Sequence, residues 1–317
     1  MRVTANSAAA FTVRPAQLYG VLGIGVVAVS TASLFIRFAQ NDGASSLVIA
    51  AWRLALATLI LTPIVIARHR IELSGLRRGQ IMLALLSGSL LGLHFATWIS
   101  SLEYTSVLNS VTLVSLNPLF VAMATPLLLH DRLTRRTLIG IALAIAGGLI
   151  ISAAGSAGSA PIHNAPLLGD GLALIGAVAV AGYFVIGRRL RASLGLVPYI
   201  WLTYGSAAIV LIAAVIVTGG QIAGLAPSAY LWMILLALLP QLIGHTAYNY
   251  ALGHLSAAFV SLSVLGEPIG STLLAIVLLS ERPNAVQLFG SLFIFAALIV
   301  ASRAEVSTSV KAAELVP

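Results

Sequence analysis

Ten apolar stretches follow one another along the chain, and each is long enough to cross a lipid bilayer. A helix needs about 20 apolar residues to span a hydrocarbon core roughly 30 Å thick. The stretches of this length are 18–38, 45–67, 79–101, 105–129, 135–153, 168–188, 198–218, 228–252, 256–279 and 284–302. Strands of a membrane barrel would alternate apolar and polar residues over about ten positions, whereas these runs are continuous. The sequence therefore predicts an all-α polytopic membrane protein with ten transmembrane helices.

The composition excludes several other classes of protein. Only 8% of the 317 residues are charged and 59% are apolar, with a mean hydropathy of +1.04. Soluble domains carry about 25% charged residues, so a soluble enzyme, a nucleic-acid binder and a disordered scaffold are excluded. The absence of cysteine excludes disulfides and thiolate metal sites. Sequence patterns of metalloproteases, nucleotide binding and serine hydrolases are also absent. We expect no enzyme activity, no cofactor and no metal.

The positions of the basic residues predict the orientation in the membrane. Cytoplasmic segments hold the Lys and Arg excess, because positive loops translocate poorly. With the N-terminus inside, all but three of the 17 Lys and Arg residues fall on the cytoplasmic side, and the exceptions are Arg37, Arg53 and Arg282. No cleavable signal precedes the first span. We therefore expect both termini in the cytoplasm.

The chain resembles itself at an offset of 150 residues. The identities include a serine, a proline, an arginine and a glycine in each half: Ser106 with Ser256, Pro118 with Pro268, Arg132 with Arg282, and Gly140 with Gly290. At an offset of 151, Gly20 matches Gly171 and Arg37 matches Arg188. An acid, Asp131 or Glu281, precedes the arginine of each pair at the end of a span. These matches indicate an internal duplication.

Each half contains five spans, so the second half must enter the membrane from the opposite face. Inverted-topology repeats of this kind are common in secondary transporters, although a duplication kept only for packing is the alternative. Small, uncharged residues between the halves indicate a linker. The predicted organisation is a cytoplasmic tail, a five-helix repeat, a linker, a second five-helix repeat and a second cytoplasmic tail: 1–17, 18–153, 154–167, 168–302 and 303–317.

The doubled motifs resemble those of the drug/metabolite transporter superfamily. They read Pro118…Asp131-Arg132…Gly140 and Pro268…Glu281-Arg282…Gly290. Within the superfamily, the chain is similar over nearly its whole length to the ten-helix EamA-type exporters, and it resembles the bacterial aromatic amino acid exporters among them. Asp131 stands where the family more often has Glu, which is a mild chemical change. The resemblance implies a multi-pass protein of the bacterial cytoplasmic (inner) membrane.

Two polar residues lie inside the spans interrupted by proline. Glu267 is about midway along the ninth span, and Asn117 is its equivalent in the fourth. Polar groups at membrane depth usually face the bundle interior or a wet cavity. A proline follows each of them and leaves the carbonyl four residues earlier without its helical donor. One interpretation is a substrate site between two broken helices, and the other is a pair of structural kinks. The helix breaks expected from proline are at Pro118, Pro240 and Pro268.

The third and eighth spans carry aromatic, imidazole and amide side chains. They are His94, Trp98, His245, Tyr248, Asn249 and Tyr250. Aromatic faces suit an apolar or aromatic ligand, and imidazole and amide groups orient it by hydrogen bonds. The alternative is an aromatic belt at the membrane interface, which applies above all to Trp98 and Tyr250.

Arg53 lies inside the second span. It has three possible roles: its side chain can extend outward to the interface, pair with an acid such as Glu103, or bind a substrate carboxylate through a bidentate contact. The spacing of Gly140, Ala144 and Gly148 suits close helix packing, within the chain or in a dimer. The expected partners are a small-molecule substrate and membrane lipids but no nucleic acid, with the protein a monomer or a homodimer.

The sequence thus predicts a secondary transporter that exports small metabolites, neutral or aromatic amino acids, across the cytoplasmic membrane by alternating access. A broad-specificity drug exporter of the same fold is one alternative. A membrane-embedded enzyme acting on a lipid precursor, with Glu267 and a histidine as acid and base, is the other.

Overall fold

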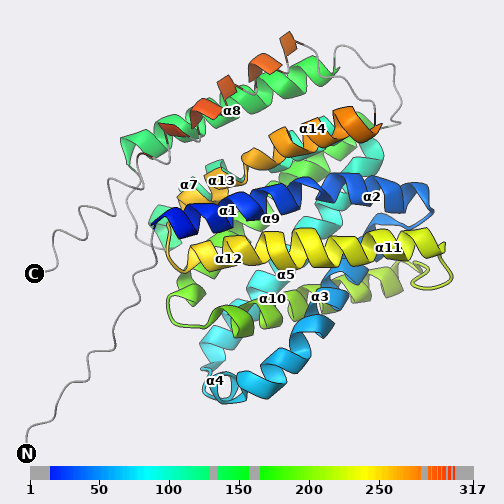
Figure 1. Ribbon diagram of the computed structural model, residues 1–317, viewed down its shortest axis with the longest axis vertical. Helices are drawn as coiled ribbons and strands as arrows, with labels where there is room; N and C mark the ends of the chain where they lie inside the picture. Colours follow the sequence, from blue (N-terminus) through cyan, green and yellow to red (C-terminus); the bar gives the residue numbers. More distant parts are fainter. Residues whose placement is uncertain are drawn as a thin grey trace, which may run out of the picture.

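The computed structural model describes residues 15–128, 134–156 and 165–279 with parts of 285–303, and the regular elements in these ranges are all helices (Figure 1). The first half contains α1 (Pro15–Ser30), α2 (Ala32–Asn41), α3 (Ser46–Arg68), α4 (Arg70–Ser74), α5 (Arg78–Tyr104), α6 (Val107–Val114), α7 (Asn117–Leu128) and α8 (Arg135–Ser156). The second half contains α9 (Pro166–Arg191), α10 (Leu196–Val217), α11 (Pro227–Leu236), the π-helix η1 (Ala237–His245), α12 (Thr246–Leu252), α13 (Ala257–Ser263) and α14 (Gly266–Leu279). The predicted all-α class is confirmed.

Seven helical stretches in the described ranges are long and apolar enough to cross a membrane. They are Ala16–Asn41, Ser46–Arg68, Arg78–Tyr104, Pro166–Arg191, Leu196–Val217, Pro227–Leu252 and Ala257–Leu278. The broken pair α6 and α7, helix α8 and helical pieces between residues 285 and 303 cover the other three predicted spans. The acid–Arg pairs Asp131-Arg132 and Glu281-Arg282, and most of the predicted linker, lie outside the described residues.

The bundle is apolar on its outside and holds polar side chains in its interior. Large apolar side chains such as Val27 and Ile209 are each 70% exposed, whereas Arg53, Gln241 and Asn249 are fully buried. A soluble protein shows the reverse preference, because water favours polar groups on its surface. In a membrane protein, lipid surrounds the outer surface and favours apolar side chains there. This distribution is that of a multi-pass membrane protein.

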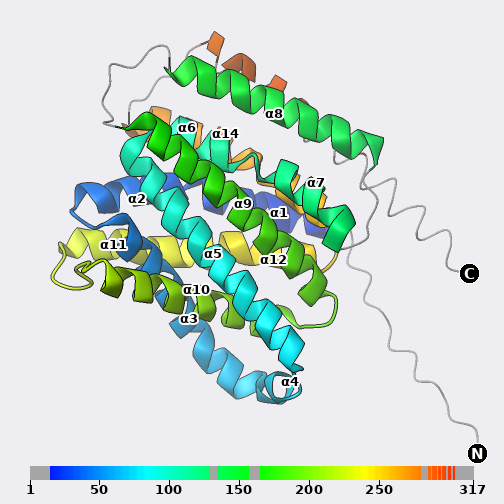
Figure 2. The same cartoon turned by 180° about the vertical axis from the view of Figure 1, so that it is seen from behind.

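The first span of each half packs against the third span of the other half. Helices α1 and α2 lie along α11, η1 and α12, and α9 lies along α5 (Figures 1 and 2). The second spans, α3 and α10, pack near the third spans, and the broken spans α6–α7 and α13–α14 pack on each other. This reciprocal exchange is the pattern that two inverted repeats related by a twofold axis produce.

The two broken spans begin and break in the same way. Ser106 and Ser256 cap α6 and α13, accepting hydrogen bonds from the backbone N–H groups of Asn109 (3.1 Å) and Phe259 (3.2 Å). A serine oxygen satisfies a free donor at a helix start, which explains the match between these positions. Each span then breaks just before Asn117 or Glu267, so the following prolines occupy a first helical turn, where a missing N–H removes no helical bond.

Pro240 does not break the eighth span, which corrects the sequence prediction. The chain stays helical there as the π-helix η1 between α11 and α12. Proline lacks an N–H and its ring clashes with the carbonyl four residues earlier in an α-helix. The i to i+5 pattern of a π-helix relieves that conflict without ending the helix, and such segments are frequent at functional sites.

The first span contains a break that the sequence does not predict. Helix α1 ends at Ser30 and α2 begins at Ala32, with the Thr31 hydroxyl donating to the carbonyl of Ala28 (2.7 Å). Helix α14 packs closely against this break. A Cβ atom at Gly270 would lie 2.6 Å from the Cβ atom of Ser30, and Ser271 donates a hydrogen bond to the Ser30 carbonyl (3.0 Å). Because glycine has no side chain, α14 can approach the first span closely at Gly270. This contact sets the position of α14, and therefore of Glu267, which lies one helical turn before Gly270.

Candidate functional site

A narrow pocket lies between the two halves, where the broken spans meet the first, second and third spans. Its lining residues are Val29, Ala32, Arg53, His94, Trp98, Val114, Asn117, Val180, Phe184, His245, Tyr248, Val264 and Glu267. The pocket therefore takes residues from both repeats, as expected for a site on a pseudo-twofold axis. Seven of the eight side chains that the sequence nominates for substrate binding lie in this lining.

The eighth, Asn249, lies behind the pocket. Its amide donates hydrogen bonds to the hydroxyl of Tyr183 (2.5 Å) and to the carbonyl of His245 (2.8 Å). Tyr250 is also outside the lining: its ring packs on His254, with the ring centroids 4.7 Å apart. Asn249 therefore supports the helix that carries His245 and Tyr248.

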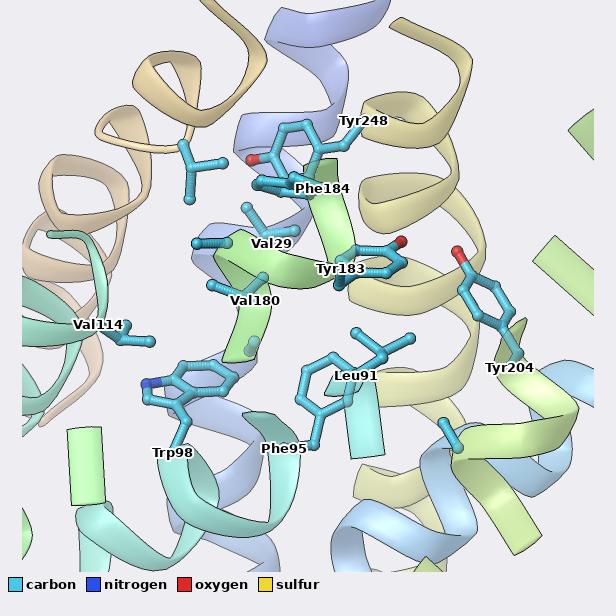
Figure 3. Close-up of a cluster of buried hydrophobic side chains, with 14 of the residues drawn as sticks. Val29, Leu91, Phe95, Trp98, Val114, Val180, Tyr183, Phe184, Tyr204 and Tyr248 are labelled. Atoms are coloured by element: carbon cyan, nitrogen blue, oxygen red, sulfur yellow. The ribbon is translucent and has the colours of Figure 1, made fainter. Parts of the chain in front are cut away.

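Aromatic side chains form much of the pocket wall. Trp98 from α5, Phe184 from α9 and Tyr248 from α12 lie around the same interior space (Figure 3). Trp98 and Tyr248 are 3% and 1% exposed, so for these two residues the interfacial-belt interpretation is wrong. The His94 ring stacks on Trp98 (centroids 5.7 Å apart, 13° between planes), and Phe184 meets Tyr248 edge to face (6.1 Å).

Arg53 is completely buried, so its side chain does not extend to the interface. Its Nε atom donates to Gln241 Oε1 (2.8 Å), and its Cζ atom lies 4.1 Å from the centroid of the Phe95 ring. Glu103, the acid considered as its partner, instead accepts hydrogen bonds from the backbone N–H and hydroxyl of Ser46. No carboxylate in the described part of the chain lies within salt-bridge distance of Arg53.

Glu267 and Asn117 line the pocket from the first turns of α14 and α7. The carbonyls of Val114 and Val264, four residues before the two prolines, both accept hydrogen bonds from other donors. Val114 O accepts from Asn117 Nδ2 (3.3 Å), and Val264 O accepts from the Glu267 N–H (2.8 Å). The polar groups that the breaks present to the pocket are therefore the side chains themselves.

The two histidines face the pocket with different hydrogen bonding. His94 Nδ1 lies 2.9 Å from the carbonyl of Gly176. Since a carbonyl only accepts, Nδ1 carries the proton, and Nε2 is the acceptor when the ring is neutral. His245 Nδ1 has no hydrogen-bond partner among the described residues.

Unpaired polar atoms gather around this pocket. Within the described ranges, the lining atoms that are buried without a hydrogen-bond partner are Arg53 Nη1 and Nη2, Trp98 Nε1, Asn117 Oδ1, His245 Nδ1 and Tyr248 OH. Buried polar groups are nearly always paired, because leaving one unmet costs about 1–3 kcal/mol. Water or a polar ligand in the pocket would meet these atoms.

Gln241, Phe95 and Phe184 contribute to the site although no sequence motif nominates them. The sequence does give one indication for Gln241, since an amide in the middle of an apolar span is uncommon and usually has a partner. It gives none for Phe95 and Phe184, because aromatic residues are common in apolar spans of every kind.

The fold and the pocket define a polytopic helical membrane protein whose two inverted halves enclose one polar and aromatic pocket. The chain belongs to the EamA-like transporter family, whose model matches residues 18–153 and again 167–303.

The chain is also similar to two other proteins. The chain is 32% identical over 146 residues to "Uncharacterized transporter YyaM" of Bacillus subtilis (strain 168), and the alignment covers 44% of this chain and 46% of that protein. The chain thus spans about half the length of this relative. A solved structure described as "Crystal structure of protein" aligns over 92% of this chain and 99% of its own, with a TM-score of 0.72 and 19% identity. The latter similarity shows a shared fold.

Proposed function

We propose that this protein exports neutral or aromatic amino acids across the bacterial cytoplasmic membrane by alternating access. The observation that carries the proposal is Arg53, a buried cation whose Nη1 and Nη2 atoms have no hydrogen-bond partner among the described residues, in the same pocket as the carboxylate of Glu267. A guanidinium binds a carboxylate through two parallel hydrogen bonds, and a carboxylate binds an ammonium group. An amino acid carries both complementary charges on one small molecule.

The aromatic wall supports a preference within that class. Trp98, Phe184 and Tyr248 offer ring faces and edges to an apolar side chain, and aromatic pairs gain about 0.5–1.5 kcal/mol beyond their buried area. The site therefore favours phenylalanine, tyrosine and tryptophan over small aliphatic amino acids.

The reciprocal packing of the two halves supports alternating access. The pocket lies where spans of both repeats meet, so rocking one repeat against the other would open it to one side of the membrane at a time. The basic residues Arg188, Arg189 and Arg191 end α9 and belong on the cytoplasmic side under the positive-inside rule. With α9 in this orientation, both termini lie in the cytoplasm.

Transport by purified protein in liposomes tests the proposal. Liposomes containing the protein are loaded separately with radiolabelled phenylalanine, radiolabelled alanine or a lipophilic cationic dye. Exchange is measured and compared with that of protein-free liposomes. We expect exchange of phenylalanine above alanine, with the recovered substrate unchanged in mass. Movement of the dye without the amino acids would favour a drug exporter, and a changed mass would indicate an enzyme.

A further inference from the structure

The guanidinium of Arg53 is held in place by two groups from opposite halves of the protein. Gln241, 188 residues away in the sequence, accepts a hydrogen bond from Nε (2.8 Å), and the Phe95 ring lies beneath Cζ at 4.1 Å. Arg53 and Gln241 are both fully buried. Nε is engaged and one face is covered, so the edge that carries Nη1 and Nη2 is the one with no hydrogen-bond partner in the described part of the chain.

The chemistry of the partner is unusual for a buried arginine. Buried charges are normally paired with an opposite charge, whereas Gln241 is neutral and supplies only an amide oxygen. It fixes the direction of the guanidinium without cancelling its charge. A carboxylate in the same place would hold the side chain equally well but would neutralise it.

The π-helix explains how Gln241 reaches this position. Gln241 lies in η1 directly after Pro240, and the same continuous helix presents His245 and Tyr248 to the pocket. Next to it, the hydroxyl of Thr246 contacts that of Tyr204 (3.3 Å), which also accepts from Asn249 (3.3 Å). Figure 3 shows Tyr204 on the side of the cluster away from Val114. The segment that departs from α-helical geometry is thus the one that bears the partner of Arg53.

We propose that Gln241 is a positioning residue that sets the charge specificity of the pocket. Because it orients Arg53 without adding a negative charge of its own, the pocket selects ligands that carry a carboxylate. This inference rests on the proposed function, in which Arg53 binds the substrate carboxylate.

The test compares two ligands that differ only in that carboxylate, L-phenylalanine and phenethylamine. Binding to the purified full chain in detergent is followed by intrinsic tryptophan fluorescence. We expect Gln241→Glu to weaken phenylalanine binding about tenfold or more, the scale of a lost charge-assisted contact, and to leave phenethylamine binding unchanged or tighter. Gln241→Met removes the acceptor without adding a charge, and we expect a smaller loss of preference for phenylalanine.

Gln80→Glu is the matched control, since it makes the same chemical change at a half-buried position in the first turn of α5, outside the pocket lining, and it should leave both affinities unchanged. The proposed role of Gln241 is contradicted if Gln241→Glu keeps the wild-type preference or weakens binding of both ligands equally. If Gln241→Glu does not fold, the same two outcomes for Gln241→Met contradict it. A wild-type protein that does not distinguish the two ligands contradicts the proposed function itself.

Discussion

Asn117 and Glu267 are 150 residues apart, each directly before a proline, and both line the same pocket. The pseudo-twofold relation between the repeats thus places a neutral amide opposite a carboxylate. Two helix breaks kept only for packing would give no reason for a buried carboxylate, because burying a charge without a partner is unfavourable. Under the proposed function, we expect the transport cycle to use the charge of Glu267.

Replacing Glu267 by Gln should separate this charge from the shape of the side chain. We expect the variant to insert and fold normally but to exchange phenylalanine poorly. In the wild type, protonation of Glu267 removes the charge that binds the substrate ammonium, so exchange should fall as the pH is lowered. The variant should lose most of that pH dependence. Residual dependence would come from the other titratable groups in the pocket, which are His94, His245, Tyr248 and Arg53. Wild-type rates and an unchanged pH profile would leave Glu267 as a structural residue.

Removing an aromatic ring should change which amino acids the protein prefers. Trp98→Ala and Tyr248→Ala should each weaken binding of phenylalanine by about 1 kcal/mol, or about fivefold, more than binding of alanine. The control is Trp201→Ala, because Trp201 is outside the pocket lining and donates to Thr62 Oγ1 (3.0 Å). An equal loss for both amino acids, measured by competition in proteoliposomes, would favour a packing role.

Adding one methyl group at Gly270 should disturb the contact between α14 and the break in the first span. The new Cβ would meet the Cβ atom of Ser30 at 2.6 Å, and overpacking of this kind costs about 1–3 kcal/mol. Gly270→Ala should therefore lower the thermal unfolding midpoint in detergent. At Gly171, in α9, the position that a Cβ would take has no atom within 4 Å, so Gly171→Ala should be neutral or slightly stabilising. Equal midpoints for the two variants would contradict the close approach.

The orientation can be measured by labelling single cysteines, since the chain has no cysteine of its own. A cysteine at Ser159, in the predicted linker, should react with a membrane-impermeant reagent added outside intact cells. A cysteine at Ser74, between the second and third spans, should react only after the membrane is permeabilised. The opposite pattern would reverse the predicted topology.

Local patterns in the sequence predict the helices well but not the contacts between the halves. Continuous apolar runs locate the spans because lipid imposes a minimum length, and the match of Ser106 with Ser256 reflects a helix cap that needs only neighbouring residues. The partner of Arg53 lies in the other repeat, so nothing near Arg53 in the sequence indicates that it is buried rather than extended to the interface. The break at Thr31 likewise lies where the distant helix α14 packs against the first span.

Exchange of radiolabelled L-phenylalanine by the Arg53→Gln variant in proteoliposomes tests the central claim most directly, because it removes the cation assigned to the substrate carboxylate. The account predicts robust exchange by the wild type and loss of about tenfold or more in the variant, with both proteins equally folded by size-exclusion chromatography. Full exchange by Arg53→Gln would contradict the claim that the pocket binds an amino acid through Arg53.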